Sequence, residues 1–196
     1  MHTPPVPFDS QAPWQPERSY SSVRLVEAGG LTTTSQLLGN LLHELLTDPA
    51  LDDAVRRDDA TLEGAVEESL RIAPPILFIA RGCRHDTEVG GAPLATGERV
   101  IVGTASANRD EAVFASGDEF QADRANADQH LTFGYGPHVC PGASLARTEA
   151  RVGLRTFLQR FPAGTVRLTA GFRFENVPTY FEVGPRRLPV ETRASA

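Results

Sequence analysis

The segment from Phe133 to Gly142, which reads FGYGPHVCPG, constrains this chain more than any other feature. Its glycines at positions 134 and 136 permit tight turns and a close approach of the backbone to a flat group. Cys140 precedes Pro141, and proline favours the first position of a helix. The sulfur is therefore expected at a helix N-terminus, where partial positive charge stabilises a thiolate. A thiolate placed there suits a soft metal ligand or a nucleophile.

The Cys-Pro pair alone leaves two interpretations of Cys140 open. Cys140 and Cys83 are the only cysteines, so the chain is not a disulfide scaffold. A lone cysteine is most often a small buried side chain with no chemical role. Only the complete segment around Cys140 favours a functional thiolate over that structural interpretation.

Composition excludes several classes of function. The net charge is -6, with 40% hydrophobic and 22% charged residues, as in an ordinary soluble globular protein. No basic cluster is present, which argues against a nucleic-acid partner. No stretch is apolar enough to span a membrane, and the N-terminus lacks the regions of a signal peptide. We expect a cytoplasmic protein.

Periodicity predicts a mainly helical chain with small β-sheets. Leucines recur at helical spacing from Leu37 to Leu46, and Asp48-Pro49 ends that helix. Further helices are expected at 50–57, 61–72 and 141–161, strands near 76–80 and at 99–102, and a turn at 89–92. Residues 105–132 form a long polar loop, and the tail, including 166–168 and 172–174, alternates like a terminal hairpin. Residues 1–24 read as a disordered or non-homologous lead-in.

The whole segment resembles the haem-binding loop of the cytochrome P450 family, Phe-Gly-x-Gly-x-His-x-Cys-x-Gly, and matches it at every fixed position through Gly142. The resemblance implies a haem (heme, iron protoporphyrin) cofactor with Cys140 as the axial thiolate ligand. It implies that His138 contacts a haem propionate and that Phe133 packs beside the sulfur. A thiolate ligand pushes electron density toward iron and favours O–O cleavage.

Glu68 and Arg71 have the spacing of a helical ion pair. Alone, such a pair is usually solvated and contributes little. In this order along the chain, it resembles the Glu-x-x-Arg of the family's K helix, which is buried and joined by a second arginine. That resemblance makes Arg124 the candidate for the third member.

Two further residues are assigned by the same resemblance. Arg81 matches an arginine that holds a haem propionate, although a surface strand arginine remains the alternative. Thr32, which follows Gly29 and Gly30, matches the threonine of the oxygen-binding kink, where it hydrogen-bonds dioxygen. The residue before that threonine is usually acidic, and here it is Leu31. We expect the segment from Ala28 to Thr33 to begin the leucine-rich helix.

The resemblance covers residues 25–196 and implies the C-terminal, haem-binding half of the fold. The implied function is monooxygenation of a small apolar substrate, with electrons from a ferredoxin-type donor. A truncated chain is expected, so an inactive remnant or a non-catalytic helper, for example of a glycosyltransferase, remains an alternative. Retention of Cys140 counts against the helper. We expect no efficient hydroxylation by this chain alone, and self-association or a partner chain through an exposed face of the 37–46 helix.

Overall fold

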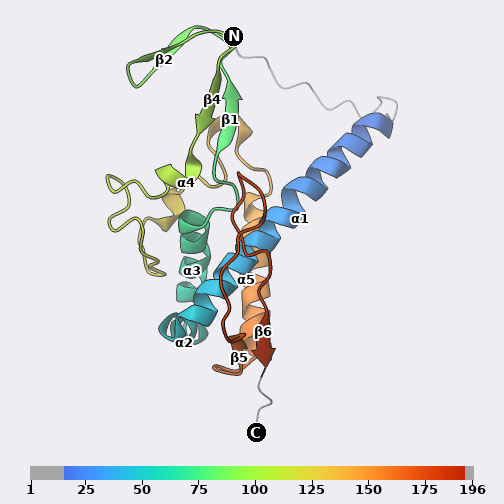
Figure 1. The fold of residues 1–196 in the computed structure, drawn as a ribbon, viewed down its shortest axis with the longest axis vertical. Helices are drawn as coiled ribbons and strands as arrows, with labels where there is room; N and C mark the ends of the chain where they lie inside the picture. Colours follow the sequence, from blue (N-terminus) through green and yellow to red (C-terminus); the bar gives the residue numbers. More distant parts are fainter. Residues whose placement is uncertain (1–15, 193–196) are drawn as a thin grey trace.

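The computed structural model describes residues 16–192, with side chains from residue 29 onward, and is mainly helical. Its long helices are α1 (Pro16–Thr47), α2 (Pro49–Arg57), α3 (Asp59–Ile72) and α5 (Ala143–Arg160). Short helical turns occur at α4 (Thr104–Ala107), η1 (Ala127–Gln129) and η2 (Gly136–His138). The helices pack into one body, and α1 runs diagonally across it (Figure 1).

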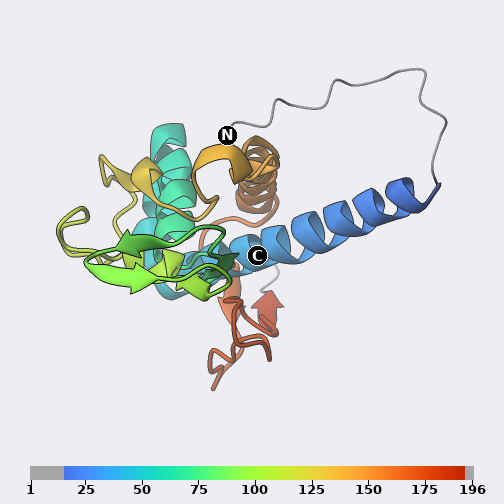
Figure 2. The ribbon, with the colours of Figure 1, turned by 90° about the horizontal axis from the view of Figure 1, so that it is seen from above.

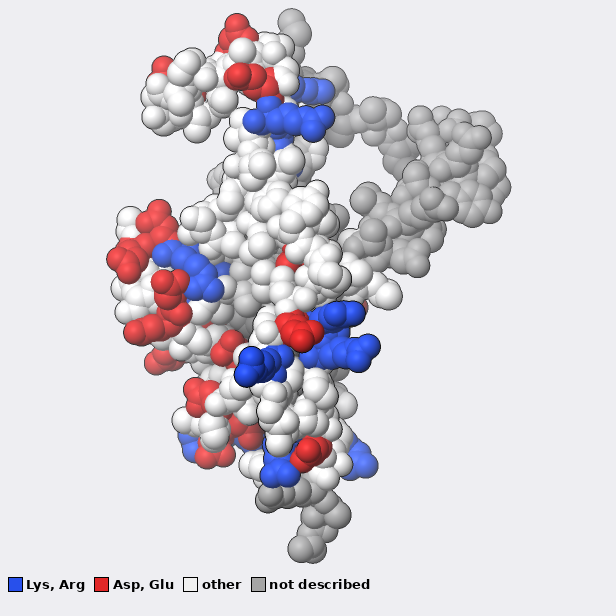
Figure 3. Space-filling model, viewed as in Figure 1, with Lys and Arg blue, Asp and Glu red and all other residues white. Residues whose placement is uncertain are grey.

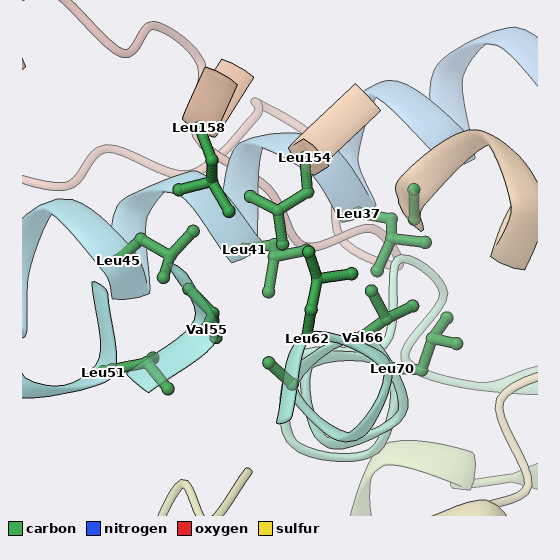
Figure 4. Close-up of a cluster of buried hydrophobic side chains, with 12 residues drawn as sticks. Leu37, Leu41, Leu45, Leu51, Val55, Leu62, Val66, Leu70, Leu154 and Leu158 are labelled. Carbon is green, nitrogen blue, oxygen red and sulfur yellow. The ribbon is translucent and has the colours of Figure 1, made fainter. Parts of the chain in front are cut away.

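The core lies where α1 meets α2, α3 and α5 (Figure 4). Leu37, Leu41 and Leu45 recur every four residues and are at most 2% exposed, as expected for the apolar stripe of an amphipathic helix. Their partners are buried aliphatic side chains of the neighbouring helices: Leu51, Val55, Leu62, Val66, Leu70, Leu154 and Leu158. The expectation of an exposed face along residues 37–46 is wrong, because the chain's own α3 and α5 cover these leucines.

Aspartates fix the starts of α2 and α3. The Asp48 carboxylate accepts hydrogen bonds from the backbone N–H of Ala50 at 2.9 Å and of Leu51 at 3.1 Å, and Pro49 occupies the first turn. Asp58 accepts from the Thr61 N–H at 2.8 Å. These N-caps satisfy donors that a helix start leaves unpaired. Both helices therefore begin one or two residues earlier than the periodicity predicts.

Three two-stranded antiparallel sheets lie at the two ends of the described part (Figure 1). At one end, β1 (Ile79–Gly82) pairs with β4 (Arg99–Val102), and β2 (Thr87–Val89) pairs with β3 (Ala92–Leu94). The predicted turn between β2 and β3 is confirmed: its glycines at 90 and 91 have φ of 58° and 82°, which favour glycine. At the other end, β5 (Val166–Leu168) pairs with β6 (Val190–Thr192).

Two strand predictions need correction. The strand expected from Ile76 begins only at Ile79, and Ile76 forms an isolated bridge with Glu182. Residues 172–174 alternate in sequence but lie outside β5 and β6. Gly171, with φ of 78°, turns the chain just before them, so the alternation does not continue the strand.

α1 begins at Pro16, well before the glycine pair, and projects beyond the rest of the helical body (Figure 2). Gly29 and Gly30 therefore lie inside this helix and do not open it. Residues 16–24, which composition assigns to a disordered lead-in, are helical, whereas residues 1–15 lie outside the described part. The division at residue 24 stays a prediction. Among the described residues, no helix has the length and apolarity needed to cross a membrane.

Candidate functional site

The Cys140 segment folds into a tight loop closed by its own backbone. Gly134 and Gly136 adopt φ of 73° and 80°, a left-handed conformation that other residues rarely adopt. The Cys140 N–H donates to the Phe133 carbonyl at 2.9 Å, which closes the loop. α5 starts at Ala143, two residues later than predicted, with Gly142 at the N-cap. Cys140 thus lies just before the helix start.

Cys140 is exposed, and its thiol forms no disulfide. Exposed apolar side chains lie on either side of it in sequence: Val139 is 52% and Leu145 61% exposed. A Cβ built on Gly142 would lie 3.8 Å from the Cys140 sulfur, and one on Gly136 would meet nothing within 4 Å. An exposed cysteine, glycines without side chains and nearby apolar groups fit a flat, apolar macrocycle whose metal accepts a thiolate.

Behind this loop lies a buried ion triad. Arg71 donates from Nε and Nη2 to the two carboxylate oxygens of Glu68, each at 2.7 Å. Arg124 donates from Nε to Glu68 Oε1 at 2.9 Å. The side chains of Glu68 and Arg71 are 0% exposed and that of Arg124 is 5% exposed. The structure therefore brings these three residues together in the interior, unlike a solvated surface pair.

The two guanidinium groups also organise the long loop before Cys140. Arg71 donates to the carbonyls of Asn108 and Gly117, both at 2.7 Å. Arg124 donates to the carbonyls of Ala115 at 2.6 Å and Ser116 at 3.1 Å. A guanidinium has five donors in a rigid fork, so one triad holds several turns of a loop that has little regular structure.

Asn108 connects this loop to the Cys140 segment, and sequence analysis did not identify it. Its side chain is fully buried, accepts from the Leu131 N–H at 2.7 Å and donates to Thr132 Oγ1 at 2.9 Å. Thr132 donates in turn to the Leu70 carbonyl on α3 at 2.6 Å. Sequence offers no signal for this role, because an asparagine in a polar loop is ordinary.

Glu67, beside the triad, is a second residue that sequence analysis missed. Arg147 donates to its two carboxylate oxygens at 2.6 and 2.9 Å, and His130 Nε2 lies 3.4 Å from Oε2. Burial alone would raise the pKa of Glu67, but His130 and Arg147 outweigh it and lower that pKa to about 2. Burial also opposes ionisation of Glu68, yet Arg71, Arg124 and the Gln121 N–H lower its pKa. Both carboxylates are anionic at neutral pH.

The other predicted site residues lie on separate elements. Arg81 is exposed on β1 and donates to the Ala80 carbonyl at 3.1 Å; Figure 3 shows basic side chains at this β1–β4 end. His138 is exposed at the end of η2, and Thr32 is exposed on α1. Next to Thr32, the Thr33 hydroxyl donates to the Gly29 carbonyl at 2.6 Å. Convergence of Arg81, His138 and Thr32 on one bound group stays a prediction.

Comparison with known proteins gives consistent matches. The family profile described as "Cytochrome P450" matches residues 21–170. A putative cytochrome P450 140 of Mycobacterium tuberculosis is 44% identical over 138 residues, which are 70% of this chain and 32% of that protein. Cytochrome P450 109 of Bacillus spizizenii is 38% identical over 168 residues, 86% of this chain and 41% of that protein. The chain thus spans less than half the length of these curated relatives.

Solved structures share the fold. The crystal structure of CYP109E1 from Bacillus megaterium in complex with testosterone superposes with a TM-score of 0.87 and 28% identity. The match covers 95% of this chain and 51% of that one. P450BioI in complex with a fatty-acyl acyl carrier protein gives a TM-score of 0.84 at 33% identity, over 92% of this chain and 46% of that one. The mainly helical fold with small sheets is therefore that of part of these proteins.

The ion triad generates a stability prediction. Glu68→Ala leaves two buried guanidinium groups without their carboxylate, which costs about 3–5 kcal/mol. Urea unfolding followed by circular dichroism measures this loss. Glu63→Ala on the same helix is the control, because the Glu63 side chain is 57% exposed; it should change the free energy of unfolding by less than about 0.5 kcal/mol. Equal stability of Glu68→Ala and Glu63→Ala would contradict the role of the triad.

The lowered pKa of Glu67 generates a pH prediction. The folded state holds this pKa at about 2, below its ordinary value of 4.5, so ionised Glu67 contributes stability above pH 4.5 that is lost as the pH falls toward 2. The wild type should therefore exceed Glu67→Gln in free energy of unfolding at neutral pH, and the difference should shrink below pH 4.5. Urea titrations from neutral pH to about pH 3 test this; a difference independent of pH would refute it.

Proposed function

Because this chain belongs to the cytochrome P450 family, we propose that it holds a haem through the thiolate of Cys140 and forms the haem-binding part of a monooxygenase. The observation that carries the proposal is the exposed, unpaired thiol in a closed loop whose residues match the family's haem-binding segment at every fixed position. The structural interpretation of Cys140 required a buried residue, and Cys140 is exposed.

Bound haem would supply the activation of dioxygen, to which a thiolate ligand contributes by donating electron density. The chain's own contribution is to present the sulfur in one place. The hydrogen bond from the Cys140 N–H to the Phe133 carbonyl fixes the backbone on both sides of the loop, and Gly136 leaves open space beside it. The Cys140 side chain then needs little reorganisation to bind, which favours ligation.

His138 and Arg81 are the proposed partners of the haem propionates. An arginine fork matches a carboxylate, and each charge-assisted hydrogen bond is stronger than a neutral one. The exposure of both side chains supports the proposal, since neither guanidinium nor imidazole would need to leave an internal partner. The hydrogen bond of Arg81 to the neighbouring Ala80 carbonyl, at 3.1 Å, is exposed to solvent, so a propionate could replace it.

Thr32, on α1, is the proposed hydroxyl that would hydrogen-bond dioxygen. Leu31 occupies the position where the family usually has an acid, and its side chain is 70% exposed. An alkyl side chain neither holds nor transfers a proton, so the proton relay lacks its carboxylate at this position. This arrangement supports the view that the chain alone does not hydroxylate efficiently.

Substrate and electron donor belong to the same proposal. The testosterone and corticosterone complexes of the similar B. megaterium protein support a mainly apolar substrate. By family, the donor is a ferredoxin-type protein and the location is the cytoplasm. Retention of Cys140 favours a haem-binding protein over a non-catalytic helper.

The proposal predicts that thiolate ligation depends on one of the two cysteines. The chain is reconstituted with haem, reduced and exposed to carbon monoxide. Its Soret band should then show the large shift to longer wavelength that thiolate ligation produces. Cys140→Ser should abolish the band, because a hydroxyl is a poor substitute for a thiolate. The matched control Cys83→Ser should retain it, because Cys83 lies beside the β2–β3 hairpin, within 3.9 Å of the Leu94 carbonyl. Loss of the band in Cys83→Ser but not in Cys140→Ser would overturn the assignment.

A further inference from the structure

Glu67 links α3 to α5 through one arginine. The two hydrogen bonds from Arg147 are parallel and bidentate, the geometry with the highest directional specificity for a guanidinium and a carboxylate. Glu67 is 22% and Arg147 30% exposed at the side chain, so solvent screens this pair less than a surface pair. Arg147 sits in the second turn of α5, close behind Cys140 in sequence.

The guanidinium of Arg147 also covers the ring of Phe133. Its central carbon lies 4.7 Å from the ring centroid, within the range of a favourable cation–π contact. The ring of His130 lies against the same phenyl group, with 5.6 Å between centroids. The Phe133 ring therefore contacts two side chains that both lie against Glu67.

His130 contacts its neighbours through both ring nitrogens. Its Nδ1 accepts a hydrogen bond from the Thr132 N–H at 3.2 Å, so in the neutral ring the proton is on Nε2. The buried Nε2 faces Glu67 Oε2 at 3.4 Å. The contact forms no hydrogen bond and is an electrostatic contact between the imidazole and the carboxylate.

Phe133 is hydrogen-bonded directly to the backbone of the cysteine. Its carbonyl accepts the Cys140 N–H at 2.9 Å, and the preceding residue, Thr132, is tied to α3 through the Leu70 carbonyl. A shift of the Phe133 ring therefore moves the backbone to which Cys140 is bonded. We infer that Glu67, Arg147 and His130 are positioning residues that lock Phe133 and thereby set the placement of the Cys140 sulfur for its ligand. The identity of that ligand as haem iron rests on the proposed function.

The same two helices provide a natural control. Arg151 and Glu63, one turn further from the loop, form an analogous ion pair at 3.1 Å. Arg155 and Asp59 form another at 2.7 Å. These exposed pairs also join α3 to α5, but they lie away from the Phe133 end of the helices. A difference between Glu67 and Glu63 variants thus separates positioning of the loop from clamping of the helices.

Hydrogen–deuterium exchange of the full chain, read by mass spectrometry on peptides that cover residues 131–142, tests the inference. Glu67→Gln keeps the side-chain shape and removes the charge, and we expect the Cys140 amide to exchange at least about tenfold faster than in the wild type, the factor for about 1.4 kcal/mol of local opening. Glu63→Gln should leave this exchange unchanged. Phe133→Leu retains the ion pair and should reproduce the faster exchange, which covers the case in which Glu67→Gln does not fold.

The haem-reconstituted variants provide a second, spectroscopic measurement. The measured quantity is the fraction of the reduced carbon monoxide complex that shows the Soret band of thiolate ligation. This fraction should fall at least about twofold in Glu67→Gln and Phe133→Leu, and it should stay at the wild-type level in Glu63→Gln. Equal exchange in Glu67→Gln and Glu63→Gln, or unchanged exchange in Phe133→Leu, would overturn the inference. Absence of the thiolate band in the wild type would instead refute the proposed function, while the exchange comparison would still decide the positioning role.

Discussion

The arrangement of the helices and the long loop depends on the buried ion pairs of Glu68 with Arg71 and Arg124. The Glu68 carboxylate accepts three hydrogen bonds from two guanidinium groups and one from the Gln121 N–H at 3.0 Å. Removing a carboxylate from water costs several kcal/mol, and the cost is offset only when partners satisfy its oxygens. Here every oxygen has a charged partner. The two arginines also donate hydrogen bonds to loop carbonyls. The triad therefore fixes the backbone of a segment that has little regular structure.

A series of hydrogen bonds connects the triad to the cysteine loop. Arg71 fixes the Asn108 carbonyl, and the Asn108 side chain holds residues 131 and 132. Thr132 then precedes Phe133, whose carbonyl binds the Cys140 N–H. Three separate contacts with α3, through Arg71, Leu70 and Glu67, therefore converge on the cysteine loop. A metal ligand on a loop needs this kind of support, because a loop without a packed face has little rigidity of its own.

Those parts of the fold that depend on neighbouring residues alone could be predicted from the sequence. The leucine stripe from Leu37 to Leu45, the stop at Asp48-Pro49 and the β2–β3 turn follow from periodicity and turn chemistry. The grouping of Glu68 with Arg124 came from family resemblance, not from spacing. What sequence could not provide is long-range pairing: Glu67 and Arg147 are 80 positions apart. The predicted exposed leucine face was wrong for the same reason, since its covering side chains come from distant helices.

The central claim is that this loop places the Cys140 sulfur on iron. X-ray absorption at the iron edge of the haem-reconstituted chain tests it most directly, because it detects the element that ligates the metal. A Cys83→Ser chain, in which Cys140 is the only cysteine, should show one sulfur in the iron coordination shell. A shell of nitrogen and oxygen alone in that variant would contradict the account.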